Sequence, residues 1–259
     1  MPLPLEVKRL VEALRQGILD AIGDNLTGVY LCGSLALGDF DPQTSDVDLL
    51  VVTGRPVSDP EMRALADLHQ HISPTGNRFS QEYEVYYIDR ATIRRFAPGQ
   101  VHVKIGPDDP FQWTEHRPGW VIERWVVREH GVVLSGPDPR TLIDAVSPDG
   151  LREAAAGEIR VRLQNWNDST WPLTEMAHRG SQGFEVETVC RALYTIATGE
   201  VSSKRRSVEW AIDVLPERWH GLVEWSQRCR KDLTRDEGRV PEVLDFLRWA
   251  VAEPERRRE

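Results

Sequence analysis

The spacing of apolar residues predicts alternating helices and strands in the first half of the chain. An amphipathic helix is predicted at the start, ending near Gly23, because apolar residues recur at helical spacing: Val7, Leu10, Val11, Leu14, Ile18 and Ile22. A second helix is predicted to have Asp59 as its N-cap and Pro60 as its first residue, and a third to cover residues 118–129. Runs of apolar and aromatic residues predict strands at 29–32, 46–52, 82–88, 100–105 and 131–137.

Beyond residue 148 the strand signal fades and helical patterns take over. Helices are predicted at residues 151–166, 184–198, 204–214, 216–233 and 241–251, with Gly199 ending the second of them. Residues 147–150 are interpreted as a linker, and the polar, glycine-containing stretch 167–183 as a loop. The sequence therefore predicts two domains: an α/β domain with a mixed sheet and flanking helices over residues 1–148, and an all-α helical bundle over 149–259.

Composition and charge narrow the possible partners. Hydrophobic residues make up 40% of the 259 residues and charged residues 28%, as in soluble globular proteins. The net charge of −9 disfavours nucleic acid as a partner and suits a small cationic substrate. The three cysteines have neither disulfide-framework nor zinc spacing, and no apolar run is long enough to span a bilayer. We expect a cytoplasmic monomer.

Two carboxylates at the start of the second predicted strand are the strongest chemical signal. Asp46 and Asp48 are two residues apart, so in a strand their side chains point to the same face. Two adjacent carboxylates repel each other unless a cation lies between them, and Mg²⁺ prefers such oxygen ligands. Upstream, Gly33 and Ser34 form a turn whose backbone N–H groups and hydroxyl suit a phosphate. Together these residues predict a metal–nucleotide site.

This pattern resembles the nucleotidyltransferase superfamily related to DNA polymerase beta. Gly33, Ser34, Asp46 and Asp48 match its motif, which is a Gly-Ser turn, a spacer, and Asp-x-Asp opening an apolar strand. Members with a third active-site carboxylate carry it on a following strand. Glu84 matches that place best, and Glu82, nearer the start of the strand, is the alternative.

The second half resembles one branch, the aminoglycoside (3″)(9) O-adenylyltransferases. The matching residues are Cys190–Tyr194, Thr198–Val201, Lys204 and Trp210-Ala211, and the run from Glu129 to Pro137 resembles the end of that family's first domain. The resemblance implies that ATP binds in a cleft between the domains and that two Mg²⁺ ions bridge Asp46, Asp48 and the phosphates. It implies that Glu84 is the general base. It also implies nucleotide contacts from Gly33, Ser34, Ser45, Arg191 and Lys204.

The acceptor implied by the resemblance is a streptomycin- or spectinomycin-like hydroxyl compound. A cationic aminocyclitol needs carboxylates and an aromatic face, and the candidates near the second domain's Arg-bearing helix are Trp166, Trp171, Glu185 and Glu187. Ser181 stands where the family has an acidic residue ten positions before Arg191. Two alternatives stay open: a nucleotidyltransferase with another acceptor, such as a protein hydroxyl or a tRNA end, and an inactive nucleotide-binding module.

Overall fold

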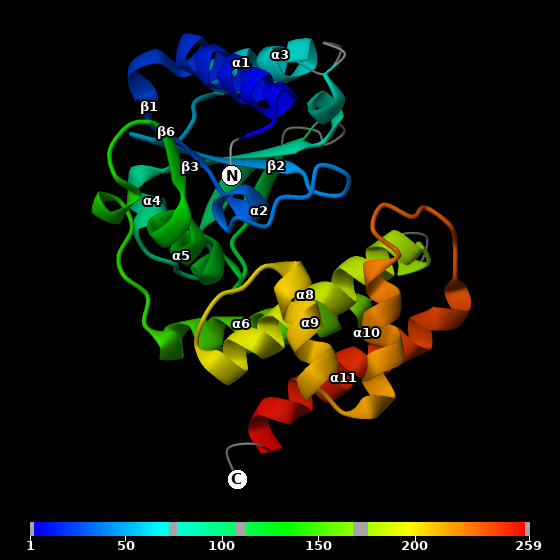
Figure 1. The fold of residues 1–259 in the computed structure, drawn as a ribbon. Coiled ribbons are helices and arrows are strands. Elements are labelled where there is room, and N and C mark those ends of the chain that lie inside the picture. The colour runs from blue at the N-terminus through cyan, green and yellow to red at the C-terminus, as the bar shows by residue number, and fades with distance from the viewer. Residues whose placement is uncertain (1–2, 73–76, 107–111, 168–175, 257–259) are drawn as a thin grey trace. The chain divides into compact units, whose positions relative to one another are not determined.

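The computed structural model describes residues 3–72, 77–106, 112–167 and 176–256, and these form two compact units (Figure 1). The first unit comprises Met1–His116 and Glu123–Ala145, and the second comprises Arg117–Ile122 and Val146–Glu259. Arg117–Ile122 thus packs with the second unit although it precedes the expected boundary at residue 148. Within that unit the Gly119 N–H donates to Oε2 of Glu158 at 3.2 Å.

A six-stranded sheet forms the centre of the first unit, in the order β5-β4-β3-β2-β1-β6. Its strands are β1 (Leu26–Leu31), β2 (Val47–Thr53), β3 (Tyr83–Asp89), β4 (Val101–Ile105), β5 (Gln112–Glu115) and β6 (Val132–Ser135). Only the β2–β3 pair is parallel, while the other neighbouring strands are antiparallel. The predicted mixed sheet is therefore confirmed, and the edge strand β5 is an addition that the sequence pattern did not indicate.

Helices cover the sheet on both faces, as Figure 1 shows. They are α1 (Leu5–Ile22), α2 (Gly33–Ala36), α3 (Asp59–Ile72), α4 (Arg90–Arg94) and α5 (Trp120–His130). The apolar positions predicted for α1 are all buried, and they pack with α3 on alternate residues of β1 to β4. On α3, the two ring nitrogens of buried His69 each lie 2.9 Å from a tyrosine hydroxyl, those of Tyr83 and Tyr87. The opposite face of the sheet is left to carry Asp48 and Glu84.

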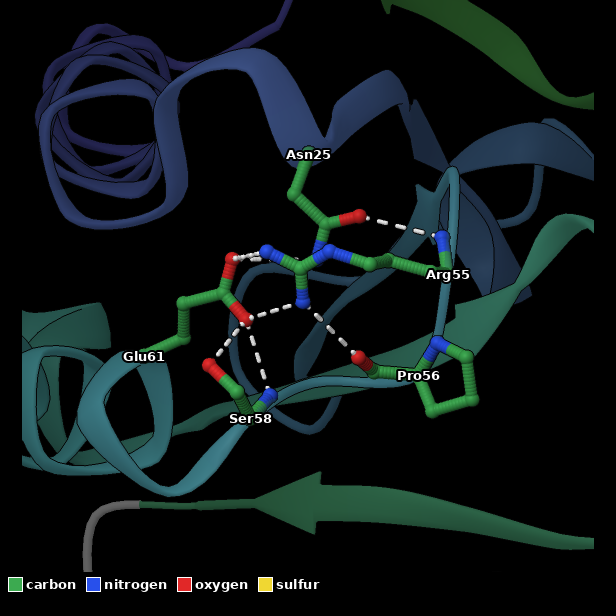
Figure 2. A network of polar contacts seen from close by, with 5 residues as sticks. All are labelled: Asn25, Arg55, Pro56, Ser58 and Glu61. Carbon is green, nitrogen blue, oxygen red and sulfur yellow. Dashed lines mark hydrogen bonds and ion pairs between the residues drawn. The ribbon is translucent and has the colours of Figure 1, made fainter.

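The start of α3 differs from the prediction by one residue. Asp59 is the first helical residue and Ser58 occupies the N-cap position, so the assignment of Asp59 as N-cap was wrong. The Glu61 carboxylate accepts from the Ser58 N–H (2.8 Å), as in one half of a capping box, and from the Ser58 hydroxyl (2.6 Å). Arg55 and Asn25 donate to the same carboxylate (Figure 2). These bonds hold the connection between β2 and α3 in place.

The second unit is all-helical in the described residues, as predicted. It contains α6 (Pro148–Asn167), α8 (Arg179–Thr198), α9 (Lys204–Val214), α10 (His220–Gln227) and α11 (Val240–Arg256), with short 3₁₀ turns between some of them. Gly199 ends α8 with a left-handed φ of 75°, as predicted. Across the described ranges, every helix is too short or too polar to cross a membrane.

Three predicted boundaries in this unit were wrong. The expected linker at 147–150 is the start of α6: the Ser147 hydroxyl accepts from the Gly150 N–H at 3.1 Å, and Pro148 is the first helical residue. Helix α8 begins at Arg179, inside the expected loop, because its glycines allow close packing. A Cβ on Gly183 would lie 3.0 Å from the Ser226 carbonyl oxygen. The expected helix at 216–233 is shorter and ends at Gln227.

Candidate active site

The turn between β1 and α2 lies directly against Asp48. Gly33 has a φ of +58°, and a Cβ at this position would overlap the Asp48 carboxylate, lying 2.9 Å from its Cγ. The Cys32 N–H donates to the backbone oxygen of Asp48 at 3.0 Å, which ties the turn to β2. A glycine is therefore required here both for the left-handed backbone and for the approach of the carboxylate.

Asp48 and Glu84 are neighbours across the parallel β2–β3 pair. The register places Asp48 opposite Glu84, so both side chains extend from the same face of the sheet. Asp46 lies one residue before β2 and is exposed, so the prediction that both aspartates lie within the strand was wrong by one residue. Glu84, the residue predicted to carry a third carboxylate on the following strand, lies beside Asp48. Glu82 precedes β3, and its carbonyl accepts from the Val47 N–H at 2.9 Å.

The donor set of this face suits Mg²⁺ together with a nucleotide. Within the described parts of the chain, no three His, Cys, Asp or Glu side chains converge closely enough to hold a metal ion by themselves. Mg²⁺ commonly binds through one or two carboxylates and completes its shell with water and substrate phosphates. Asp46 and Asp48 are the carboxylates that would provide such a partial shell, and Mg²⁺ bound there would neutralise charge on the phosphates.

Negative charge gathers around the site. Burial, and then the charges of Asp48 and Glu123, raise the pKa of the Cys32 thiol well above its ordinary value. Burial, and then the charges of Glu84 and Asp48, likewise raise the pKa of the Tyr86 phenol. The phenol therefore stays protonated and can act as a hydrogen-bond donor. A local field of this sign attracts cations to the sheet face.

Two side chains hold Glu84 in place. The Tyr86 hydroxyl donates to Oε2 of Glu84, and the ammonium of Lys104 on β4 lies 2.8 Å from Oε1. Strand alternation places Tyr86 on the same face as Glu84, but Lys104 was not found from the sequence, because it reaches Glu84 only through the pairing of β3 with β4. The pattern of aromatic and charged residues in each strand gave no signal for this contact.

Ser34 and Ser45, the two serines predicted to contact the nucleotide, both lie in the segment that joins β1 to β2. Ser34 is half-buried in α2, and its carbonyl accepts from the Asp39 N–H at 3.0 Å. The Ser45 hydroxyl accepts from the Asp41 N–H at 3.0 Å, and the Ser45 N–H donates to the Asp41 carbonyl at 2.8 Å. These bonds fix the loop that leads into Asp46.

In the second unit, the two predicted cations come together. Lys204 begins α9, and its ammonium lies 3.8 Å from the centroid of the half-exposed Phe184 ring. Burial, and then the nearby charge of Arg191 on α8, lower the pKa of Lys204 to about 8, against an opposing contribution from Glu187. The surroundings of Lys204 are thus rich in positive charge, which a phosphate would relieve.

The residues predicted for the acceptor are largely buried. Glu185 is 3% exposed and accepts from Arg162 at 2.8 Å, and Glu187 is 1% exposed and binds Arg230 through both oxygens at 3.0 and 3.1 Å. Trp166 is 4% exposed in α6, and its indole N–H has no hydrogen-bond partner among the described residues. Trp171 lies outside the described residues. The arginine partners of both glutamates were not identified from the sequence.

Two family models match consecutive parts of the chain. The model described as a nucleotidyltransferase domain matches residues 8–124, and the model described as the C-terminal domain of aminoglycoside adenylyltransferase matches residues 142–252. The chain has the two domains of an aminoglycoside adenylyltransferase. The resemblance seen in the sequence is therefore confirmed in both halves, and the chain is a nucleotidyltransferase rather than a binding module without activity.

Named relatives cover most of the chain. A spectinomycin 9-adenylyltransferase of Staphylococcus aureus is 27% identical, over 82% of this chain and 80% of its own length. An aminoglycoside (3'') (9) adenylyltransferase of Klebsiella pneumoniae is 25% identical, over 88% of this chain and 87% of its own length. The crystal structure of a spectinomycin adenyltransferase from Enterococcus faecialis with ATP and spectinomycin superposes with a TM-score of 0.74 at 16% identity, covering 94% of this chain and 98% of that one. This last likeness confirms the predicted fold.

Proposed function

We propose that this enzyme transfers AMP from ATP to a hydroxyl of an aminoglycoside-type antibiotic similar to streptomycin or spectinomycin, with Mg²⁺ as its cofactor. The observation that carries the proposal is the register of β2 and β3. This register places Asp48 beside Glu84, and the Asp48 carboxylate also lies against the Gly33 turn. The second half of the same chain matches the aminoglycoside adenylyltransferase C-terminal domain.

Each proposed role follows from the chemistry of AMP transfer. The acceptor oxygen forms a bond to the α-phosphorus, the bond to the bridging oxygen of pyrophosphate breaks, and Glu84 accepts the proton from the acceptor hydroxyl. Asp46 and Asp48 would hold Mg²⁺, which supplies positive charge to the attacking and leaving oxygens. The Gly33 turn, Ser34 and Ser45 would contact the triphosphate. Arg191 and Lys204 would neutralise charge on the leaving pyrophosphate.

The acceptor is proposed from the names of the relatives and from the charge of the protein. A net charge of −9 favours a cationic acceptor over nucleic acid. Trp166, Trp171, Glu185 and Glu187 stay predictions for the acceptor contacts. Because Glu185 and Glu187 already bind arginines, a cationic acceptor would share these carboxylates with Arg162 and Arg230.

The decisive experiment is mass spectrometry of an acceptor panel incubated with enzyme, ATP and Mg²⁺. Spectinomycin or streptomycin is expected to gain the mass of an adenylyl group, and omission of Mg²⁺ should prevent the reaction. Asp48→Asn is expected to abolish transfer while the protein still folds, because Mg²⁺ affinity depends on carboxylate charge. Near wild-type transfer by this variant would show that Asp48 is not a metal ligand.

Another acceptor is the second candidate, and Ser181 is the observation that favours it. The position is acidic in the resembling family but holds a serine at the start of α8 here, so a cationic group would lack one partner. Radiolabelled ATP would distinguish the two cases. Label should enter the antibiotic if the first proposal is right, and tRNA or protein if the acceptor differs.

A further inference from the structure

The side chains around Glu84 suggest a role for a residue that no sequence motif marks. Lys104 pairs with Tyr86 across the antiparallel β3–β4 ladder, and Glu84 is two residues before Tyr86 on the same face. Lys104 and Glu84 are thus a diagonal cross-strand pair, a separation that a long side chain can span. The ammonium spans it and lies 2.8 Å from Oε1 of Glu84.

Both oxygens of the Glu84 carboxylate are engaged, each from a different direction. Lys104 binds Oε1 while the Tyr86 hydroxyl donates to Oε2. A glutamate has three side-chain torsions, and two simultaneous contacts restrict them to one direction. The carboxylate is therefore oriented before any substrate arrives.

Two buried histidines, His102 and His116, continue the packing around the Tyr86 ring. The Tyr86 ring lies 5.7 Å from the ring of His102, which is 1% exposed and is itself 4.9 Å from the ring of His116. Nδ1 of His116 lies 3.0 Å from the Arg124 guanidinium. Tyr86 is thus fixed by packing, whereas Lys104 has 24% of its side chain exposed and reaches Glu84 from the neighbouring strand.

Because the Lys104–Glu84 pair is partly exposed, its effect on the orientation of the Glu84 carboxylate can be distinguished from its effect on folding stability. With side chains 24% and 33% exposed, the pair is partly solvated, and ion pairs of this kind contribute little to folding stability. Orientation of a reacting group, in contrast, has a large effect on rate. We propose that Lys104 is a positioning residue that fixes the direction of the Glu84 carboxylate. The inference rests on the proposed function, in which Glu84 accepts the proton of the acceptor hydroxyl.

The kinetic test compares Lys104→Met and Lys104→Arg with wild type, using ATP with spectinomycin and streptomycin. Lys104→Met should lower kcat about 10–100-fold, the fold-change expected for loss of a charged hydrogen bond, without changing KM for ATP or the unfolding midpoint. Lys104→Arg should restore most of kcat. Arg95→Met, which removes an exposed cation that pairs with Asp144, is the matched control and should leave kcat unchanged.

A double-mutant cycle shows whether Lys104 acts through Glu84. In a Glu84→Gln background, Lys104→Met should cause little further loss, because the group that Lys104 positions has already been removed. An equal loss in both backgrounds would overturn the proposal. A rise in KM for ATP with unchanged kcat would also overturn it, since it would assign Lys104 to nucleotide binding.

A crystallographic measurement decides the inference without any acceptor. In crystals of the wild-type enzyme, Glu84 should adopt one side-chain conformation, and in Lys104→Met crystals it should occupy several. A single unchanged conformation in the variant would refute the positioning role. If the wild type transfers AMP to no antibiotic, the proposed function fails while this measurement still gives its answer.

Discussion

The contact between Gly33 and Asp48 allows a sharp test of the active-site assignment. Gly33→Ala would place a methyl group at a backbone φ of +58°, overlapping the Asp48 carboxylate and lying 2.9 Å from its Cγ. Gly38→Ala is the matched control in the same segment. Its φ is +69°, but an added Cβ would have no heavy atom within 4 Å. Both variants therefore carry similar backbone strain, and only one disturbs the carboxylate.

The expected magnitudes separate the two effects. An L-residue in the left-handed region costs about 1 kcal/mol relative to glycine, so both variants should lose about that much stability. Relief of the overlap at Gly33 requires a further shift, on the order of 1 Å, of Asp48 or of the turn. A misplacement of this size typically lowers the rate about 100-fold. Gly33→Ala should therefore lose about 100-fold in kcat, and Gly38→Ala should stay close to wild type.

Urea unfolding measures the strain, and steady-state AMP transfer at saturating ATP measures kcat. Activity close to wild type in both variants would refute the claim that the Gly33 turn positions Asp48 for catalysis. Equal losses of activity would instead point to general strain in the segment as the cause.

Three further outcomes are expected. Glu84→Gln should lower kcat roughly 10²–10⁴-fold, whereas Glu82→Gln should have a mild effect; the reverse order in steady-state assays would move the base to Glu82. Burial raises the pKa of Glu61, but its hydrogen bonds outweigh this and lower the pKa to about 2. The folding stability that the ionised Glu61 contributes is fully present above its pKa in the unfolded chain, about 4.5, and is lost as pH falls towards 2. Allowing for solvent screening, Glu61→Gln should lose about 1–2 kcal/mol at pH 7 by urea unfolding, and the difference should shrink at pH 3. Burial lowers the pKa of Lys204 to about 8, so KM for ATP should rise above pH 8 in wild type but stay flat in Lys204→Arg, and parallel profiles would exclude Lys204 as the titrating group.

Local patterns predicted those parts of the fold that depend on residues close in sequence. The apolar positions of α1 are all buried because one helix face meets the sheet. The bounds of α9 were predicted correctly, and the Ser203 hydroxyl caps its Arg206 N–H at 3.3 Å. The Gly33-Ser34 turn and the Asp48 strand were likewise visible, because each is defined by a few adjacent residues.

Features that depend on contacts between distant segments were missed. Lys104 meets Glu84 only because β4 pairs with β3, and Arg162 meets Glu185 only because α6 packs on α8. Glycines were misinterpreted for the same reason. Gly180 suggested a loop, but in α8 it provides room for the backbone of Asp232, whose carbonyl oxygen lies 3.0 Å from where a Cβ would be. A single sequence does not indicate which neighbour a glycine accommodates.

The division of the chain into two units affects how related enzymes could exchange parts by recombination. Arg117–Ile122 belongs to the helical unit but lies between two segments of the first unit. A crossover near residue 148 would join these six residues from one parent to helices from another. The donor helices would then have to provide a carboxylate in place of Glu158 to accept from the Gly119 N–H. They would also need a glycine in place of Gly157, because a Cβ there would lie 2.9 Å from the ring of Pro118. A working chimera therefore needs its donor helices to match at these positions, or three crossovers in place of one.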